Sequence, residues 1–232
     1  MRPVIGVPLR YQALADGRPI LYLEERVRRV LQDAGGYVFP FAPVQNLDYM
    51  NTRGNEFPEL TEEEKNCIHK NLDACDGIFF PGGIKMTPYD RYLLEYAILK
   101  KIPVLAVCLG MQMMSCYQED VRLEKNEGFN HHQGTDDFSL SHKVIIDKDS
   151  FLYQILGKDE ICVNSFHNYH GTKNHVYQTV AVSEDGLIEA LEYPGDVFNI
   201  GVQWHPEISY FFDENSKKII YAFMDAARKK KV

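Results

Sequence analysis

Residues 102–112 read IPVLAVCLGMQ, and this stretch indicates which fold the chain adopts. A short apolar run leads into Cys108, with a small residue two positions before it (Ala106) and another two positions after it (Gly110). The pattern is typical of a nucleophile elbow, where a strand turns sharply into a helix and presents one side chain at the edge of a sheet. Small flanking residues allow the strand and the helix to approach closely. We therefore expect an α/β fold with Cys108 at the end of a strand.

Residues 201–207, which read GVQWHPE, supply a candidate base and a candidate carboxylate. His205 would take the proton of the Cys108 thiol and later return it to a leaving amine. Glu207 would fix the tautomer of the imidazole. A helix N-terminus and a neighbouring imidazole both favour the thiolate form of a cysteine. The two stretches together predict a cysteine hydrolase with Cys108, His205 and Glu207 as its catalytic residues.

Such an enzyme also needs donors for a developing oxyanion, and we expect the backbone amides of Leu109 and Gly83 to supply them. Each assignment has a plainer alternative: a cysteine after an apolar run is often structural, His205-Pro206 fits a simple turn, and Pro81-Gly82-Gly83 does too. The catalytic interpretation is favoured because all these residues follow predicted strands, where open α/β sheets place their sites.

Composition excludes several classes of protein. The chain has 232 residues, 45% of them hydrophobic and 25% charged, with a formal charge of −8, which disfavours a nucleic-acid surface. No apolar stretch approaches the roughly 20 residues that span a bilayer, and the N-terminus is too short in apolar residues for a signal peptide. The five cysteines form no C-x-x-C pair, so neither a disulfide framework nor a zinc knuckle is expected. These features predict a cytoplasmic protein without a membrane or nucleic-acid partner.

Strand and helix patterns alternate in the first half of the chain. Apolar runs and cap residues predict strands at 4–7, 37–41, 77–80 and 104–107, and helices at 22–33, 61–72, 90–101 and 109–117. The second half adds strands at 144–146, 161–164, 179–182, 188–192 and 200–203, with one clear helix at 216–228. We expect an open, mostly parallel, flavodoxin-like sheet flanked by helices, with an antiparallel section in the C-terminal half. The absence of a linker predicts a single domain over residues 1–232.

A histidine-rich segment, His131-His132-Gln133-Gly134 with His142 beyond it, raises the question of a metal site. No cysteine or carboxylate lies at a ligand-like spacing in a recognisable motif. The segment is rich in Gly, Asn and Asp, so we expect a loop that lines the pocket, and no metal.

Four motifs resemble those of class I glutamine amidotransferases. The segment CLGMQ at 108–112 resembles their C-x-G-x-Q nucleophile motif, and QWHPE at 203–207 resembles Q-[FW]-H-P-E. FPGG at 80–83 is similar to their oxyanion strand, and VNSFH at 163–167 to their V-N-S-x-H segment. Within this class the chain most resembles the γ-glutamyl hydrolases of the peptidase C26 type, including γ-glutamyl-γ-aminobutyrate hydrolases. The resemblance implies attack by cysteine on a γ-glutamyl amide, a thioester intermediate and no cofactor.

The resemblance also implies substrate-binding residues. Gln112 matches a glutamine that helps to hold the glutamyl group, although it also fits as a polar residue of the elbow helix. Ser165 and Phe166 match a segment whose backbone holds the α-amino and α-carboxylate ends, and a strand followed by a loop would account for them too. His167 matches a position of the class but fits equally as a packed loop histidine.

Two departures concern the leaving-group side. Residues 168–170 read NYH where relatives often have a histidine or glycine followed by glutamine, and the loop at 84–89 is short. The amine half of the substrate is therefore left open.

Three functions are considered: a stand-alone hydrolase of small γ-glutamyl amides, a glutaminase subunit that passes ammonia to a synthase partner, and a non-catalytic binding protein. The first is favoured because no synthetase domain is fused to the chain. The third is disfavoured because all three catalytic candidates are present. The charge permits a monomer or a homodimer equally.

Overall fold

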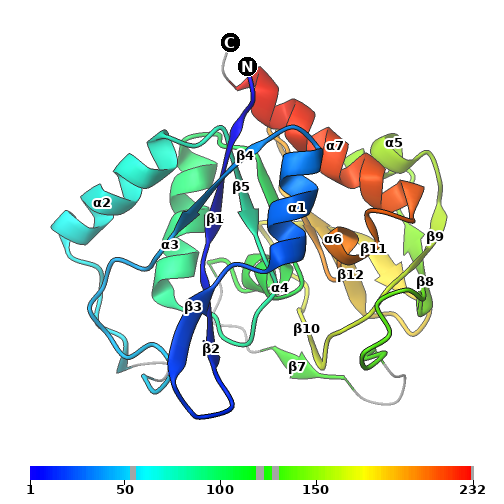
Figure 1. Ribbon diagram of the computed structural model, residues 1–232. Helices are drawn as coiled ribbons and strands as arrows, with labels where there is room; N and C mark the ends of the chain where they lie inside the picture. Colours follow the sequence, from blue (N-terminus) through cyan, green and yellow to red (C-terminus); the bar gives the residue numbers. More distant parts are fainter. Residues whose placement is uncertain (53–55, 119–122, 127–130, 231–232) are drawn as a thin grey trace.

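The computed structural model describes residues 1–52, 56–118, 123–126 and 131–230. Within these residues a nine-stranded sheet forms the centre of the molecule (Figure 1). Its parallel part runs, in spatial order, through β4 (Tyr37–Phe41), β1 (Val4–Pro8), β5 (Gly77–Phe80), β6 (Val104–Val107) and β13 (Asn199–Val202). Its antiparallel part continues through β12 (Ile188–Glu192), β11 (Gln178–Ser183), β8 (His142–Ile146) and β9 (Glu160–Val163). The predicted parallel sheet with an antiparallel addition is confirmed.

Helices cover both faces of this sheet. One core lies under α1 (Glu25–Asp33), α5 (Phe151–Leu156) and α7 (Glu214–Lys229). The other lies under α2 (Glu62–Asp73), α3 (Pro88–Leu99) and α4 (Leu109–Ser115). Strand β6 is apolar throughout because it is buried on both faces. Leu105 and Val107 pack into the first core, whereas Val104 and Ala106 pack into the second. A strand buried on both faces has no polar positions to alternate with apolar ones.

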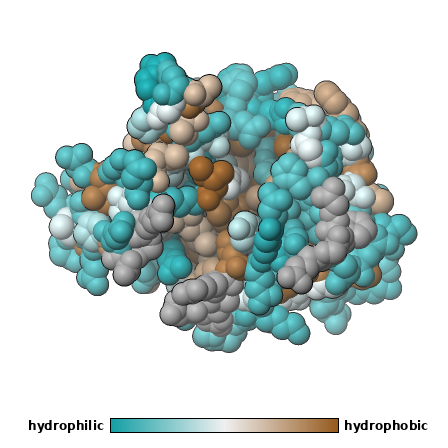
Figure 2. Space-filling view, turned by 90° about the horizontal axis from the view of Figure 1, so that it is seen from below, coloured by the Kyte–Doolittle hydropathy of each residue, from teal (hydrophilic) through white to brown (hydrophobic). Residues whose placement is uncertain are grey.

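The C-terminal ends of the parallel strands meet at the lower edge of Figure 1, opposite the chain termini. Two small pairs lie at the same edge: the hairpin β2 (Arg10–Ala13) with β3 (Pro19–Tyr22), and β7 (Glu124–Lys125) with β10 (Tyr169–His170). Seen from below, this edge carries hydrophobic side chains near its centre, with hydrophilic residues around them (Figure 2).

Neither the short strands β2, β3, β7 and β10 nor the helices α5 and α6 (Pro206–Ser209) were predicted from the sequence. The helix expected from Tyr22 begins at Glu25, because Tyr22 belongs to β3 and pairs with Arg10. The Asp16-Gly17 dipeptide was the available signal, since Gly17 adopts φ 82° in the turn between the two strands. Of the two unpredicted helices in the second half, α5 has clear signals in the sequence. Its signals are Ser150, whose side chain accepts a hydrogen bond from the amide of Tyr153, and Gly157, which ends the helix at φ 69°.

Smaller differences concern helix ends. Helix α3 begins at Pro88 rather than at Asp90, and α4 ends at Ser115 rather than at Tyr117. Among the helices of the described ranges, none combines the length and hydrophobicity needed to cross a bilayer.

Candidate active site

Cys108 lies between β6 and α4 in a backbone conformation that side chains rarely adopt, with φ 52° and ψ −107°. Such a conformation is strained for a residue other than glycine, and strain of this kind gathers at functional sites. Gly110 makes the turn feasible, because a Cβ atom there would lie 2.7 Å from the backbone oxygen of Phe80 and 3.2 Å from the Cβ of Ala106. The structure therefore contains the sharp strand-to-helix turn expected from the sequence.

The next parallel strand brings His205 and Glu207 to Cys108. Strand β13 pairs with β6 in a register that sets Val202 opposite Val107, so the segments that follow both strands start side by side. The Nδ1 of His205 lies 2.6 Å from Oε1 of Glu207, and the imidazole also hydrogen-bonds to Cys108. Cys108 is 8% exposed and Glu207 is 2% exposed, whereas the His205 side chain is 11% exposed. The three side chains therefore form a chain of contacts at the edge of a buried region.

The charge around His205 favours its protonated form. Burial opposes that form, but the Glu207 carboxylate and the Cys108 sulfur outweigh burial and raise the pKa of His205 well above its usual value. An imidazolium beside a cysteine favours the thiolate, which is the nucleophilic form.

This charge balance leads to a prediction about pH. Glu207→Gln is expected to lower the pKa of His205, because the substitution removes the largest influence that stabilises the imidazolium. A raised folded-state pKa contributes stability that is complete below about pH 6.5 and is lost as pH rises through the folded pKa. Carbon-13 NMR of labelled histidine across a pH series measures the titration directly. Identical titration of His205 in the wild-type protein and the variant would contradict the assigned role of Glu207.

Asn164 holds the backbone of His205 and was not singled out by sequence reasoning. Its side-chain oxygen accepts a hydrogen bond from the His205 amide at 2.8 Å, and its side-chain nitrogen donates one to the His205 carbonyl at 2.8 Å. Asn164 directly follows β9, so the antiparallel part of the sheet also fixes the position of His205.

The predicted oxyanion residues lie close together. A Cβ atom at Gly83 would be 3.0 Å from the Leu109 side chain, and one at Gly82 would be 2.8 Å from the His205 ring and 3.5 Å from the Cys108 Cβ. Leu109 is the first residue of α4, so its backbone N–H has no acceptor within the helix. The structure thus places both glycines of the segment after β5 beside the turn at Cys108.

Arg10 fixes this glycine segment from the neighbouring hairpin, and its role was missed because the contact spans 71 residues. Its Nε and Nη2 donate to the Pro81 carbonyl at 3.1 and 2.7 Å, and its Nη1 donates to Asp90 at 2.7 Å. Arg10 is only 3% exposed, and Asp90 in turn caps α3 through Thr87. The orientation of the peptide that begins at Pro81 therefore depends on a buried guanidinium.

Arg10→Lys should lower kcat about tenfold with little change in KM, because lysine keeps the charge beside Asp90 but lacks the fork that holds the Pro81 carbonyl. Steady-state kinetics with a hydrolysed amide measures both constants. Arg18→Lys is the matched control, since Arg18 lies exposed beyond the hairpin turn and contacts Asp16. An unchanged kcat in Arg10→Lys would contradict this role.

The predicted substrate-binding residues occupy different positions. Phe166 lies beside His205, and the centres of the two rings are 5.7 Å apart. Ser165 is buried, and its hydroxyl donates to the His131 carbonyl at 2.7 Å. His167 is also buried, and its Nδ1 lies 3.0 Å from the Tyr169 carbonyl oxygen. Gln112 donates from its side chain to the carbonyl of Tyr169 at 2.7 Å, so its amide nitrogen already has a protein partner.

Comparison with known proteins agrees with the fold and the motifs. The sequence model of the peptidase C26 family matches residues 87–207. NtpR of Enterococcus hirae is 34% identical over 234 residues, which cover 90% of this chain and 93% of that protein. The γ-glutamyl-γ-aminobutyrate hydrolase PuuD of Escherichia coli K12 is 27% identical over 88% of this chain and 85% of its own. The glutaminase domain of Trypanosoma brucei CTPS, solved with bound acivicin, has a TM-score of 0.61 at 18% identity, covering 98% and 94% of the two chains.

These matches establish the class as that of amide hydrolases and amidotransferases with the glutamine amidotransferase fold. The chain belongs to the peptidase C26 family.

Proposed function

We propose that this protein hydrolyses a γ-glutamyl amide through a thioester on Cys108, releasing glutamate and an amine. The observation that carries the proposal is the contact chain from Cys108 through His205 to Glu207, set on a strained strand-to-helix turn. A nucleophile, a base and an orienting acid in this order are the parts that acyl transfer needs. The similarity to PuuD, a γ-glutamyl-γ-aminobutyrate hydrolase, supports the choice of substrate class.

In the first half-reaction the Cys108 thiolate attacks the amide carbonyl carbon, and the carbonyl electron pair moves to oxygen. Backbone amides of Gly83 and Leu109 would donate hydrogen bonds to this oxyanion. When the tetrahedral intermediate collapses, the C–N bond breaks, and His205 gives its proton to the leaving amine. A γ-glutamyl thioester on Cys108 remains.

In the second half-reaction a water molecule attacks the thioester carbonyl while neutral His205 takes one of its protons. Collapse of this intermediate breaks the C–S bond, which releases glutamate and restores the Cys108 thiolate beside the His205 imidazolium. Glu207 holds the Nδ1 side of the ring throughout, so the opposite nitrogen stays directed at the sulfur and the reacting atoms.

The proposal is tested by glutamate release from a panel of glutamine, γ-glutamyl-γ-aminobutyrate, γ-glutamyl polyamines, other γ-glutamyl amides and folate polyglutamates, with Cys108→Ala as control. We expect one of these amides to be hydrolysed much faster than glutamine. No turnover across the panel, with Cys108 still reactive towards a thiol reagent, would reject the free-standing hydrolase in favour of a glutaminase subunit that needs a synthase partner.

A further inference from the structure

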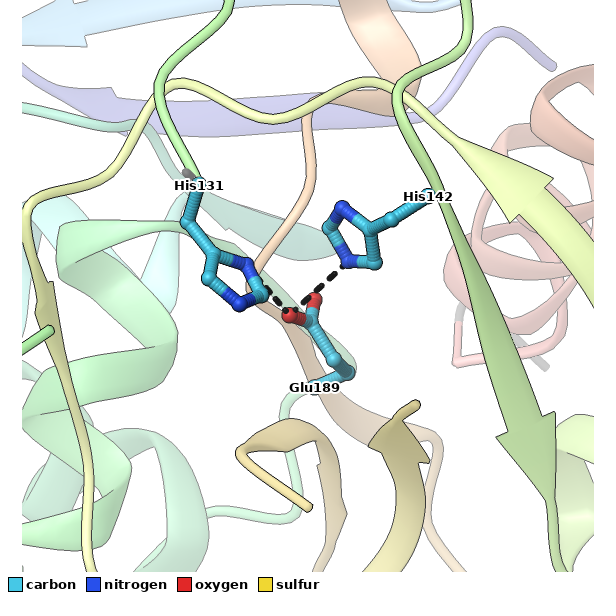
Figure 3. Close-up of side chains that lie close together, drawn as sticks. All are labelled: His131, His142 and Glu189. Carbon is cyan, nitrogen blue, oxygen red and sulfur yellow. Dashed lines mark hydrogen bonds and ion pairs between the residues drawn. The ribbon is translucent and has the colours of Figure 1, made fainter. Parts of the chain in front are cut away.

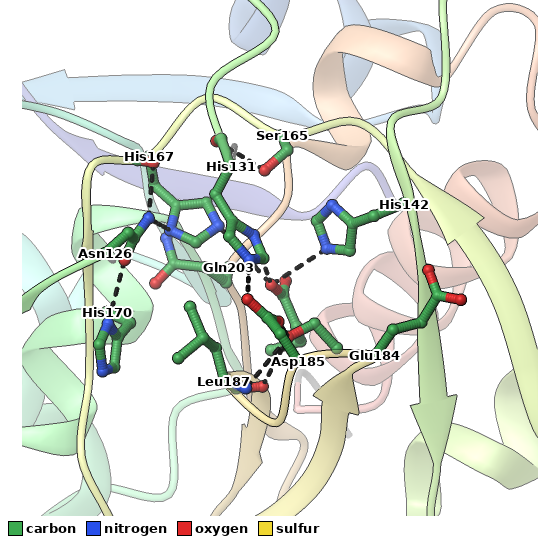
Figure 4. A network of polar contacts seen from close by, with 12 residues as sticks. Asn126, His131, His142, Ser165, His167, His170, Glu184, Asp185, Leu187 and Gln203 are labelled. Atoms are coloured by element: carbon green, nitrogen blue, oxygen red, sulfur yellow. Dashed lines mark hydrogen bonds and ion pairs between the residues drawn. The ribbon is translucent and has the colours of Figure 1, made fainter. Parts of the chain in front are cut away.

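Three buried histidines surround one carboxylate oxygen of Glu189; Figure 3 shows His131 and His142 beside it, and Figure 4 shows His167 as well. From Oε1 of Glu189, the Nε2 of His142 lies 3.1 Å away, the Nδ1 of His131 3.6 Å and the Nε2 of His167 3.6 Å. All four side chains are buried. They come from distant parts of the chain, with Glu189 on β12 and His142 at the start of β8, so the sequence showed no carboxylate near the histidines.

Glu189 is the charged centre of this group. Its burial raises the pKa of the carboxyl, but the histidines, above all His142 and His167, outweigh burial and lower the pKa of Glu189 below its usual value. A buried carboxylate is stable only when neighbouring donors or positive charge compensate for lost hydration. His142 and His167 supply that compensation, whereas burial lowers the pKa of His131, whose far side lies 3.0 Å from Asp185.

The histidine rings contact the carboxylate directly, and ligand atoms of His131, His142 and Glu189 also lie within 4.8 Å of one another, close enough to hold a metal ion. A zinc ion would need its own position about 2.0–2.2 Å from each ligand atom. Here the ring nitrogens of His131 and His142 are directed at the Glu189 carboxylate itself, which lies between them (Figure 3). The same oxygen lies 3.6 Å from the Nε2 of His167, so all three rings approach one carboxylate oxygen.

Two of these histidines hold the segment that carries Phe166. The His131 carbonyl accepts hydrogen bonds from the Ser165 hydroxyl at 2.7 Å and from the His167 amide at 2.9 Å. Phe166 lies between these two anchored residues and contacts the His205 ring. The backbone carbonyl of Glu189 accepts from the Gln203 amide at 2.7 Å, two residues before the base. Glu189 therefore contacts both chain segments that flank His205.

We propose that Glu189 is a positioning residue whose buried carboxylate, through His131 and His167, holds the segment from Ser165 to His167 in the shape that binds the γ-glutamyl group. The expected effect of Glu189 on substrate binding rests on the proposed function. Its expected effect on the shape of the segment from Ser165 to His167 does not. Glu189 touches neither Cys108 nor the reacting atoms, so its influence acts on binding more than on bond breaking.

Glu189→Gln tests this role, because it keeps the size of the side chain while removing its charge. Glu192→Gln is the matched control: Glu192 is a second buried carboxylate on β12, and it accepts from the amides of Phe151 and Leu152 instead. Hydrogen exchange of amides 164–170 should become faster in Glu189→Gln only, while amides 108–112 exchange at the wild-type rate. This readout requires no turnover, so it stands even if no γ-glutamyl amide is hydrolysed.

Kinetics with a hydrolysed amide gives the second readout. KM should rise about tenfold or more in Glu189→Gln with kcat within about threefold of wild type, and Glu192→Gln should leave both constants unchanged. If Glu189→Gln does not fold, His142→Gln can replace it, because this substitution removes one partner of the carboxylate. It should change KM and the exchange rates in the same direction, but by a smaller factor. Wild-type exchange at 164–170, equal effects in the two glutamate variants, or a stoichiometric metal ion in the purified protein would overturn the proposal.

Discussion

Cys108→Ala is expected to reduce glutamate release at least about a thousandfold, because no other group on the turn can form the thioester. Folding should be unaffected, since the substitution removes one small, nearly buried sulfur and leaves the turn backbone unchanged. Steady-state assays give the loss of activity, and circular dichroism during thermal unfolding gives the change in stability.

Cys116→Ala is the control for Cys108→Ala. Cys116 is also buried and lies at the end of α4, away from the turn. Its removal should leave activity within about twofold of wild type. Undiminished activity in Cys108→Ala would exclude covalent catalysis by this residue.

Glu207→Gln should lower kcat by about two to three orders of magnitude, a smaller loss than that of Cys108→Ala. The carboxylate orients the His205 ring across a 2.6 Å contact and stabilises its charged form, but it forms no bond to substrate. Single-turnover rates of thioester formation measure the effect on the first half-reaction.

Glu214→Gln provides the corresponding control, because Glu214 is exposed on the first turn of α7 and pairs with Lys217. Its kinetics should match wild type. A loss in Glu207→Gln as large as that in Cys108→Ala would mean that the acid does more than orient the base.

The central part of the fold was predictable because its signals are local. Apolar runs such as residues 104–107 are long enough to mark a buried strand, and Thr61 with Glu64 marks a helix start that the structure shows as a capping box. The hairpin β2–β3 was missed because Arg10 is polar and buried, which breaks the alternation that identifies a strand. Helix α5 was missed because its six residues are too few to show a helical period.

The candidate site, like the fold, contains some residues that local sequence patterns predict and others that they do not. Cys108, His205 and Glu207 stand in short motifs, so their roles were inferred from neighbouring residues. Arg10 and Glu189 act through partners far away in the chain, and no local pattern distinguishes a buried arginine from an exposed one. Contacts of this kind depend on strand order and register, which a single sequence does not reveal.

Covalent catalysis by Cys108 can be tested by mass mapping of the protein quenched in acid during turnover. The substrate is the γ-glutamyl amide that the panel shows to be hydrolysed fastest. We expect one γ-glutamyl group on the peptide that contains Cys108, and none on the same peptide from Cys108→Ala. Rapid turnover with the γ-glutamyl group on a different residue, or with turnover retained in Cys108→Ala, would contradict covalent catalysis by Cys108.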